Sequence, residues 1–126
     1  KISETKTEYV LYSPAPSNKG QILIIPKRHV SNIRELTKTE TANFFKTVRE
    51  VSIKIQEHLK PNGINYGFNE NKIAGQTIEH LHFHIIPRFK NDKLPKYHLF
   101  HRRKKDKKYL SEEELKICVK KLKNFK

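Results

Sequence analysis

Histidine and apolar residues alternate one by one between His80 and Ile85, and this alternation constrains the fold more than any other feature of the 126-residue sequence. Successive side chains of a β-strand point to opposite faces, so the pattern predicts a strand over residues 80–86. The apolar residues then form a core face, and the histidines share the opposite face, either exposed or in a pocket. The core set is Leu81, Phe83 and Ile85, and the second set is His80, His82 and His84.

Three further strands are predicted from β-rich or apolar runs. Residues 8–12 have the composition of a strand, residues 21–25 form an apolar run that Pro26 stops, and residues 64–68 form a third such run. In the same way, Pro87 is expected to close the histidine strand.

Two helices are predicted from pairs of residues with capping-box spacing. Thr37 and Glu40 open a long helix that ends at the Pro-Asn-Gly turn of residues 61–63, and Ser111 and Glu114 open a C-terminal helix. Their apolar stripes are Phe44, Val48, Val51, Ile55 and Leu59 in the long helix, and Leu115, Val119 and Leu122 in the last one. The order of elements predicts an α+β fold with a mainly antiparallel sheet.

The length of the chain predicts a single domain over residues 1–126, with a catalytic core at about 8–90 and a basic segment with the C-terminal helix at 91–126. No apolar run approaches the roughly 20 residues that cross a bilayer, and no signal-peptide pattern is seen, so we expect no membrane partner. Cys118 is the single cysteine, which excludes an intramolecular disulfide and favours a cytoplasmic location.

The net charge of +14, from 27 Lys and Arg against 13 Asp and Glu, favours partners that carry phosphate. The lysines are scattered along the chain, with the densest basic cluster at residues 102–108. The charge therefore leaves mononucleotides and nucleic acid both open as partners, and a lysine-rich surface without a function explains it equally well.

Three interpretations of the histidine strand compete. The first is a polar sheet face without a function. The second is a metal site, but the outer two histidines would lie roughly 13 Å apart along a strand, whereas each zinc–nitrogen bond is about 2.1 Å. The third is phosphate chemistry, in which a neutral imidazole attacks phosphorus and neighbouring N–H groups stabilise the charge on the phosphoryl oxygens. Gly75, Gln76 and Thr77, just upstream, would supply further donors.

The third interpretation gains weight from a resemblance. The Gly-Gln-Thr approach, the His-x-His-x-His strand and the closing Pro87-Arg88 resemble the signature of the histidine-triad (HIT) family. The resemblance extends to residues 24–29 and to Asn69, and covers most of residues 8–90.

The resemblance implies a five-stranded sheet and transfer of a nucleoside 5′-phosphate to the middle histidine, His82. His80 would orient that ring, mainly through its backbone carbonyl. The phosphate oxygens and the leaving group would be held by His84, Gln76, Thr77 and Asn69. The resemblance further implies a homodimer, purine nucleotides as ligands, and no cofactor or metal ion.

Two positions depart from the pattern of the family. Gln21 stands where many members have a histidine, and Ser13 stands where an Asp or Asn often holds the ribose. Both are still candidate pocket residues, although a plain loop or strand role is an equal alternative. The other histidines are expected to be structural in the case of His29 and solvated in the case of His98 and His101.

The leading hypothesis is therefore a hydrolase of nucleotide conjugates such as phosphoramidates or dinucleoside polyphosphates, with a nucleotidyl-His82 intermediate. Removal of adenylate from nucleic-acid ends is an alternative that the basic charge would suit. A nucleotide-binding or interaction module with weak catalysis is another, because of Ser13 and Gln21. The uridylyl-transferase branch is disfavoured, since its members have Gln where His84 stands.

Overall fold

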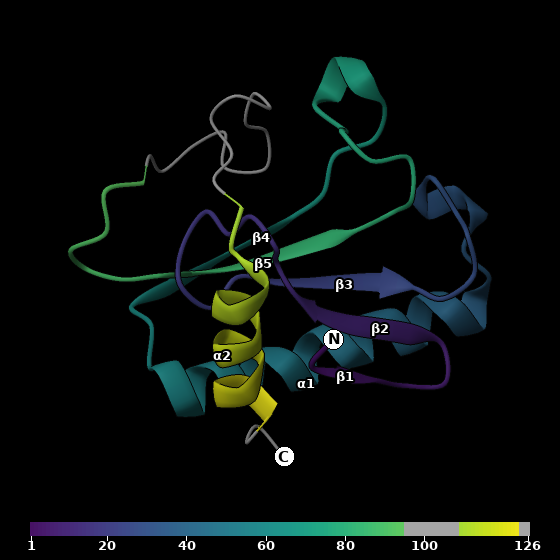
Figure 1. Ribbon diagram of the computed structural model, residues 1–126. Helices are drawn as coiled ribbons and strands as arrows, with labels where there is room; N and C mark the ends of the chain where they lie inside the picture. Colours follow the sequence, from purple (N-terminus) through teal and green to yellow (C-terminus); the bar gives the residue numbers. More distant parts are fainter. Residues whose placement is uncertain (95–108, 124–126) are drawn as a thin grey trace.

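Five strands form one antiparallel sheet in the order β1-β2-β3-β5-β4. The computed structural model describes residues 1–94 and 109–123 (Figure 1). The strands are β1 (Ser3–Glu4), β2 (Glu8–Tyr12), β3 (Ile22–Pro26), β4 (Gly63–Gly67) and β5 (Phe83–Arg88). The helices are η1 (Ile33–Glu35), α1 (Lys38–Leu59), η2 (Lys72–Ala74) and α2 (Glu112–Lys123). The predicted α+β class and antiparallel sheet are thus confirmed.

Both capping boxes form as predicted. The Thr37 hydroxyl accepts from the N–H of Glu40 at 3.0 Å, and the Glu40 carboxylate accepts from the N–H of Thr37 at 2.9 Å. Ser111 and Glu114 make the same reciprocal pair at the start of α2, with 3.1 Å for each bond. Because these bonds satisfy N–H groups that have no partner within a helix, they fix where each helix begins.

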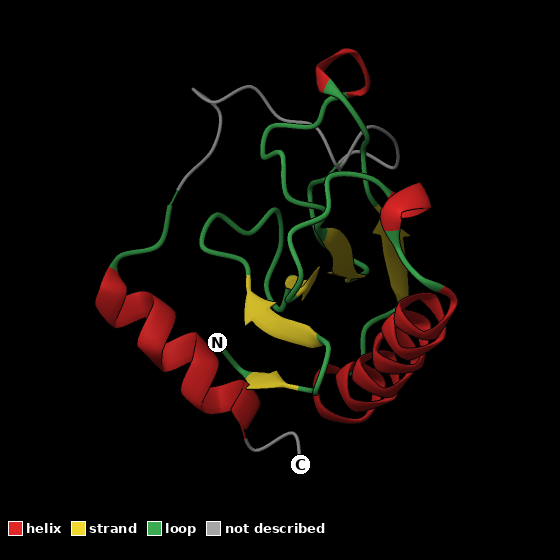
Figure 2. Ribbon diagram, turned by 90° about the vertical axis from the view of Figure 1, so that its right-hand side faces the viewer, coloured by secondary structure: helices red, strands yellow, loops and turns green. Residues whose placement is uncertain are grey.

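The main core lies between α1 and one face of the sheet. Phe44, Val48, Val51 and Ile55 of α1 are buried against strand residues that include Ile22, Ile24, Phe83 and Ile85. Figure 2 shows α1 and α2 on opposite sides of the β1–β2 end of the sheet. None of the helices in the described ranges has the length and apolarity that a membrane span requires.

The prediction that the histidine strand begins at His80 is wrong. β5 starts at Phe83, and of the three histidines only His84 belongs to it. The neighbouring strands explain the difference, because β3 pairs with β5 only at residues 83–85 and β4 ends opposite His84, at Gly67. Residues 80–82 therefore have no strand to pair with among those that the structure describes, and the N–H of Leu81 instead donates to the carbonyl of Val30 at 2.7 Å.

The predicted strand ends at Pro26 and Pro87 are also shifted, because each proline belongs to its strand. Pro26 is the last residue of β3, where no further N–H is needed. Pro87 lies opposite Ile64 in the part of β5 that pairs with β4 alone. A residue without an N–H is tolerated in such positions.

Candidate active site

The His82 ring is held by the backbone of the residue two positions earlier. Its Nδ1 atom lies 2.9 Å from the carbonyl oxygen of His80. A carbonyl only accepts hydrogen bonds, so Nδ1 carries the proton and the lone pair of the neutral ring is on Nε2. The residue is 9% exposed. The ring therefore has a defined orientation and tautomer, and this tautomer is the one that a nucleophilic imidazole requires.

His80 is itself fixed from the end of β3. Its Nε2 atom lies 2.8 Å from the carbonyl oxygen of Pro26, which again can only accept. Its ring also contacts the His29 ring, with centroids 4.9 Å apart. The backbone carbonyl of His80 is thus the group that holds the His82 ring. His29, which was expected to be structural, contacts the His80 ring and lines the cavity described below.

His84 lies beside His82 and contacts Gln21. The two rings are 4.9 Å apart at an angle of 70°, and the Nδ1 atom of His84 is 3.0 Å from the side-chain nitrogen of Gln21. Gln21 is 3% exposed, and its side-chain oxygen accepts from the N–H of Ser17 at 2.5 Å. Gln21 is therefore brought to the triad, and Ser17, which sequence reasoning missed, orients it through a backbone group that no side-chain pattern reveals.

Gln76 and Thr77 line a cavity of about 380 Å³ on the approach to the triad. His82 and His84 do not line it, whereas His29 does. The other lining residues, Ser31, Asn71, Lys72 and Glu79, were not singled out from the sequence. Lys72 belongs to η2 and lies four residues before Gln76, so a positive charge close to a candidate phosphate ligand was the sequence signal for it.

The Gln76 amide joins three backbone segments. Its oxygen accepts from the N–H of Asn71 at 2.6 Å, and its nitrogen donates to the carbonyls of Ser31 and Glu79 at 3.3 Å each. Gln76 therefore holds the loop around the cavity together. A phosphate oxygen bound by this amide would have to share or replace one of these bonds.

Asn69 and Ser13 each follow the end of a strand. Asn69 lies two residues beyond Gly67, where the pairing of β4 with β5 ends opposite His84. Ser13 follows β2 with its side chain buried, and its N–H donates to the carbonyl of Gln21 at 3.0 Å. Thus Ser13 and Gln21 are neighbours across the sheet, as a common pocket would require.

A family model described as the HIT domain matches residues 1–91. The chain belongs to the HIT family.

Two curated relatives are similar to this HIT chain over 88 residues each. Bis(5′-adenosyl)-triphosphatase of Dictyostelium discoideum is 38% identical over 70% of this chain and 59% of the relative. The asymmetrical Bis(5′-nucleosyl)-tetraphosphatase of Schizosaccharomyces pombe is 36% identical over 70% of this chain and 48% of the relative. The chain therefore spans between about half and three fifths of the lengths of these relatives.

A solved structure is similar to this HIT chain over nearly its whole length. A hypothetical histidine triad nucleotide-binding protein of Sulfolobus tokodaii superposes with a TM-score of 0.80 at 30% identity, covering 98% of this chain and 80% of that one. The similarity therefore includes the C-terminal part that the HIT family model does not match.

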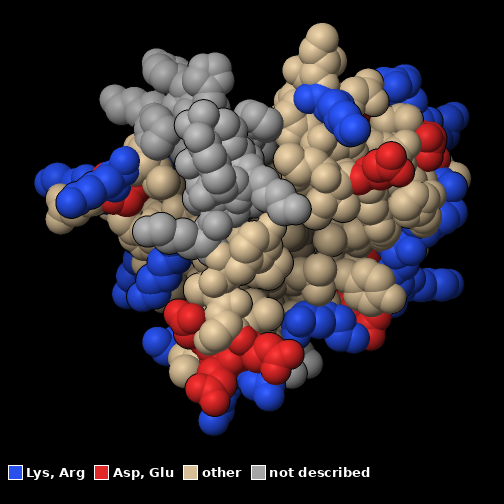
Figure 3. Space-filling view, turned by 45° about the horizontal axis from the view of Figure 1, so that its top comes forward, with Lys and Arg blue, Asp and Glu red and all other residues tan. Residues whose placement is uncertain are grey.

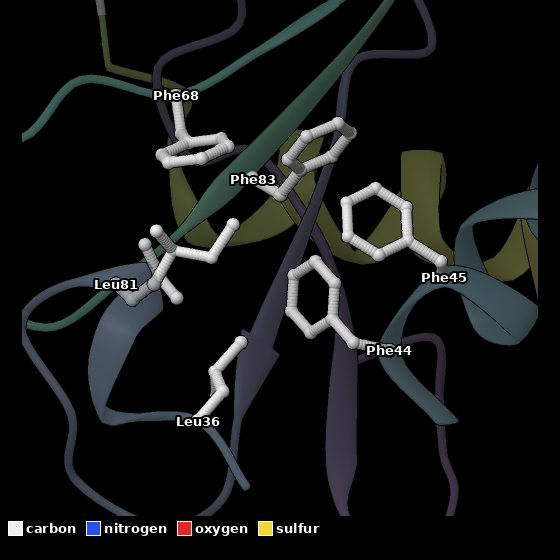
Figure 4. A pocket seen from close by; sticks show the side chains of 7 residues that line it. Leu36, Phe44, Phe45, Phe68, Leu81 and Phe83 are labelled. Atoms are coloured by element: carbon white, nitrogen blue, oxygen red, sulfur yellow. The ribbon is translucent and has the colours of Figure 1, made fainter. Parts of the chain in front are cut away.

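A second, smaller cavity of this HIT domain lies on the core side of the sheet. Phenylalanine and leucine side chains point toward one another around it (Figure 4). Its lining is entirely apolar, and its volume is about 10 Å³. A cavity of that size has room for about one water molecule, and its apolar lining offers no hydrogen-bond partner, so it is not a site for a nucleotide.

Charge is distributed around the HIT domain and not gathered into one patch in the view of Figure 3. Basic side chains lie along the left, right and lower margins of that face and near its upper right. Acidic side chains lie at its lower edge and on its right-hand side, and the tan surface at its centre carries neither. The basic cluster of residues 102–108, like His98 and His101, lies outside the described residues. Within residues 1–94 and 109–123, no three His, Cys, Asp or Glu side chains are grouped so as to hold a metal ion.

Proposed function

We propose that this chain hydrolyses nucleotide conjugates, in particular dinucleoside polyphosphates, through a nucleotidyl intermediate on His82. The observation that carries the proposal is the 2.9 Å bond between Nδ1 of His82 and the carbonyl of His80. That bond leaves the lone pair on Nε2, where a nucleophile needs it. The names of the two hydrolase relatives support dinucleoside polyphosphates as the substrate class.

The proposed reaction has two displacements at the α-phosphorus. In the first, the Nε2 lone pair of His82 forms a P–N bond while the P–O bond to the leaving polyphosphate breaks. In the second, water attacks the same phosphorus and loses a proton to the solvent. The P–N bond breaks, its electron pair returns to Nε2, and a nucleoside monophosphate leaves with His82 restored to its neutral form. Two displacements replace one difficult step, and fixed N–H donors stabilise the charge on the phosphoryl oxygens.

The cavity lined by Gln76 and Thr77 is the proposed position for the polyphosphate part of the substrate. It opens next to the segment that carries His80 and His82, and Lys72 provides a positive charge in its wall. We assign phosphate contacts to Gln76, Thr77 and Asn69, and a pocket role to Ser13. The proposed chemistry uses side chains of the protein alone and requires no metal ion or cofactor.

We also propose that the chain forms a homodimer by pairing of sheet edges. β4 ends the sheet and pairs only with β5 among the described strands, so its outer edge is available for a second copy. Sedimentation analysis would give twice the mass of the chain. A chain that stays a monomer at the concentrations used for activity assays would contradict the proposal.

The test of the catalytic proposal is a comparison of wild-type protein with His82→Ala. Diadenosine triphosphate and an adenosine 5′-phosphoramidate serve as substrates, and release of AMP is measured. The variant should lose turnover by at least about 10³-fold, as expected when the attacking group is removed. His58→Ala is the matched control, because it removes an exposed imidazole from α1.

Quenching a single turnover with substrate labelled at the α-phosphate should trap the label on His82 in the wild type only. Full activity of His82→Ala, or label on another residue, would overturn the proposal. Tight binding of AMP without turnover would favour the interaction module instead. Preference for adenylated oligonucleotides, with affinity that falls steeply as salt rises, would favour action on nucleic-acid ends.

A further inference from the structure

Gln21 has one possible orientation in this structure. Its side-chain oxygen faces the N–H of Ser17 at 2.5 Å, and its side-chain nitrogen faces Nδ1 of His84 at 3.0 Å. A backbone N–H can only donate, so the Ser17 contact determines which end of the amide is the oxygen. The amino group of Gln21 must therefore point at His84.

This orientation determines the tautomer of His84. An amide nitrogen only donates, so Nδ1 of His84 must accept, and the proton of the neutral ring is on Nε2. His82 has the opposite arrangement, because its Nδ1 donates to the carbonyl of His80. The two neighbouring rings thus differ at Nε2: His82 has a lone pair there, and His84 has a proton.

We propose that Gln21 is a positioning residue that holds His84 as the Nε2–H tautomer, so that His84 serves as a fixed N–H donor to the phosphoryl group attacked by His82. The catalytic part of this statement rests on the proposed function, whereas the assignment of the tautomer does not. The histidine that many family members have at this position could donate or accept, depending on its own protonation. Glutamine cannot change in this way.

The loop that carries Ser17 is anchored well enough to keep this orientation. The side-chain nitrogen of Asn18 donates to the carbonyl of Pro87 at 2.9 Å and to the Asp92 carboxylate at 3.0 Å. At the other end of the loop, the N–H of Gly20 donates to the Tyr12 hydroxyl at 2.8 Å. The Ser17 N–H therefore sits on a backbone that is fixed to β2 and to the end of β5.

The substitution Gln21→Glu tests the tautomer with little change of shape. One carboxylate oxygen can still accept from Ser17, while the other now faces Nδ1 of His84 and requires a proton there. The ring nitrogens of His84 are observed by ¹⁵N NMR in protein with labelled histidine. Gln56→Glu, at an exposed position of α1, is the control for the added charge.

In the wild type and in Gln56→Glu, we expect the His84 proton on Nε2. In Gln21→Glu, at a pH where the ring is neutral, we expect the proton on Nδ1 and none on Nε2. A wild-type ring with its proton on Nδ1, or a His84 signal that Gln21→Glu leaves unchanged, would overturn the proposal. These spectra require no turnover, so they give a result even if the proposed hydrolase activity is absent.

The catalytic part is tested with the same variants and the AMP-release assay. The loss of one fixed donor to a phosphoryl group should lower kcat of Gln21→Glu by roughly 10²–10³-fold, with a much smaller change in KM. The control Gln56→Glu should keep wild-type values. A variant whose tautomer changes while kcat stays the same would overturn the role of His84 as donor and leave the hydrolase proposal intact.

Discussion

The hydroxyl of Thr47 on α1 donates a 2.6 Å hydrogen bond to the carboxylate of Glu8 on β2, and both side chains are buried. Glu8 is 1% exposed, and its carboxylate also accepts from the hydroxyls of Thr5 and Thr7. A buried carboxylate is tolerated only where donors replace water, so these three hydroxyls make the position possible. Thr47 is the one that ties the helix to the sheet.

Replacing Thr47 with Val should destabilise the fold by about 1–3 kcal/mol, because it removes one donor from a buried charged acceptor. Urea unfolding followed by circular dichroism would measure the change. Thr47→Ser, which keeps the hydroxyl, should lose less. Thr41→Val is the control, since its hydroxyl donates to the Thr37 carbonyl at the exposed start of α1. Equal stability of Thr47→Val and wild type would contradict this account of Glu8.

Gly20 should not tolerate a side chain. Its φ is +85°, and an added Cβ would lie 2.5 Å from Cδ1 of Leu59 and 3.3 Å from Cγ of Pro87. We expect Gly20→Ala to cost about 1–2 kcal/mol from the backbone conformation alone, plus a steric contribution. In a Leu59→Ala background the contact with Leu59 is removed while the one with Pro87 remains, so part of the steric cost should disappear and the two substitutions will not be additive.

The control for this prediction is Gly63→Ala. An added Cβ at Gly63 has no neighbouring atom within 4 Å, so its effect should stay within about 0.5 kcal/mol. Thermal unfolding of the four variants decides the matter. If Gly20→Ala and Gly63→Ala lower the melting temperature equally, the approach of Gly20 to Leu59 of α1 does not limit the size of the residue at position 20.

Stability should fall in acid partly through Glu40. A hydrogen bond from Arg28 lowers the pKa of Glu40 from 4.5 to about 2. Because the pKa is lower in the folded protein, the ionised carboxylate stabilises the fold above pH 4.5, and this contribution is lost as the pH falls toward 2.

Glu40→Gln should therefore lower the free energy of unfolding at about pH 6, whereas the difference from wild type should shrink at about pH 3. Glutamine can still accept the Thr37 N–H, so the helix cap is kept. Glu57→Gln, at an exposed position of α1, is the matched control. Urea midpoints at the two pH values give the result, and a difference that is the same at both would rule out the ion pair as its cause.

Gln76→Ala should impair the site without unfolding the protein. It removes the bonds that join the cavity loop to Ser31 and Asn71, and misplacement of binding groups by about 1 Å can cost up to about 10²-fold. We expect kcat/KM for diadenosine triphosphate to fall by roughly 10–100-fold with a nearly unchanged melting temperature. Gln56→Ala should keep both values. A loss of stability that parallels the loss of activity would point to a purely structural role.

The sequence predicted the elements of this fold well because local chemistry determines them. The capping residues Thr37 and Ser111 begin their helices where expected, and the apolar stripe of α1 is buried as its spacing requires. The start of the histidine strand was wrong for a reason that is not local. Whether His80 and His82 belong to a strand depends on where β3 and β4 end, and no pattern within residues 80–86 contains that information.

The sequence predicted which residues form the candidate site, but it did not predict the hydrogen bonds that orient them. The triad, Gln76 and Thr77 follow from the motif, and Gln21 was noticed as a departure from it. The contacts that orient them come from backbone groups of Pro26, His80 and Ser17. Every residue carries such groups, so only the folded chain shows which of them are used.

The three imidazoles are evenly spaced in the sequence, but His84 belongs to β5 whereas His80 and His82 lie in the loop before it. His84 pairs with β3 on one side and with β4 on the other. His82 precedes β5, and its ring is bonded to the carbonyl of His80. Because the sheet ends between the two rings, two different parts of the fold set their positions. A change in strand pairing would displace His84 first, whereas a change in the loop before β5 would displace His82.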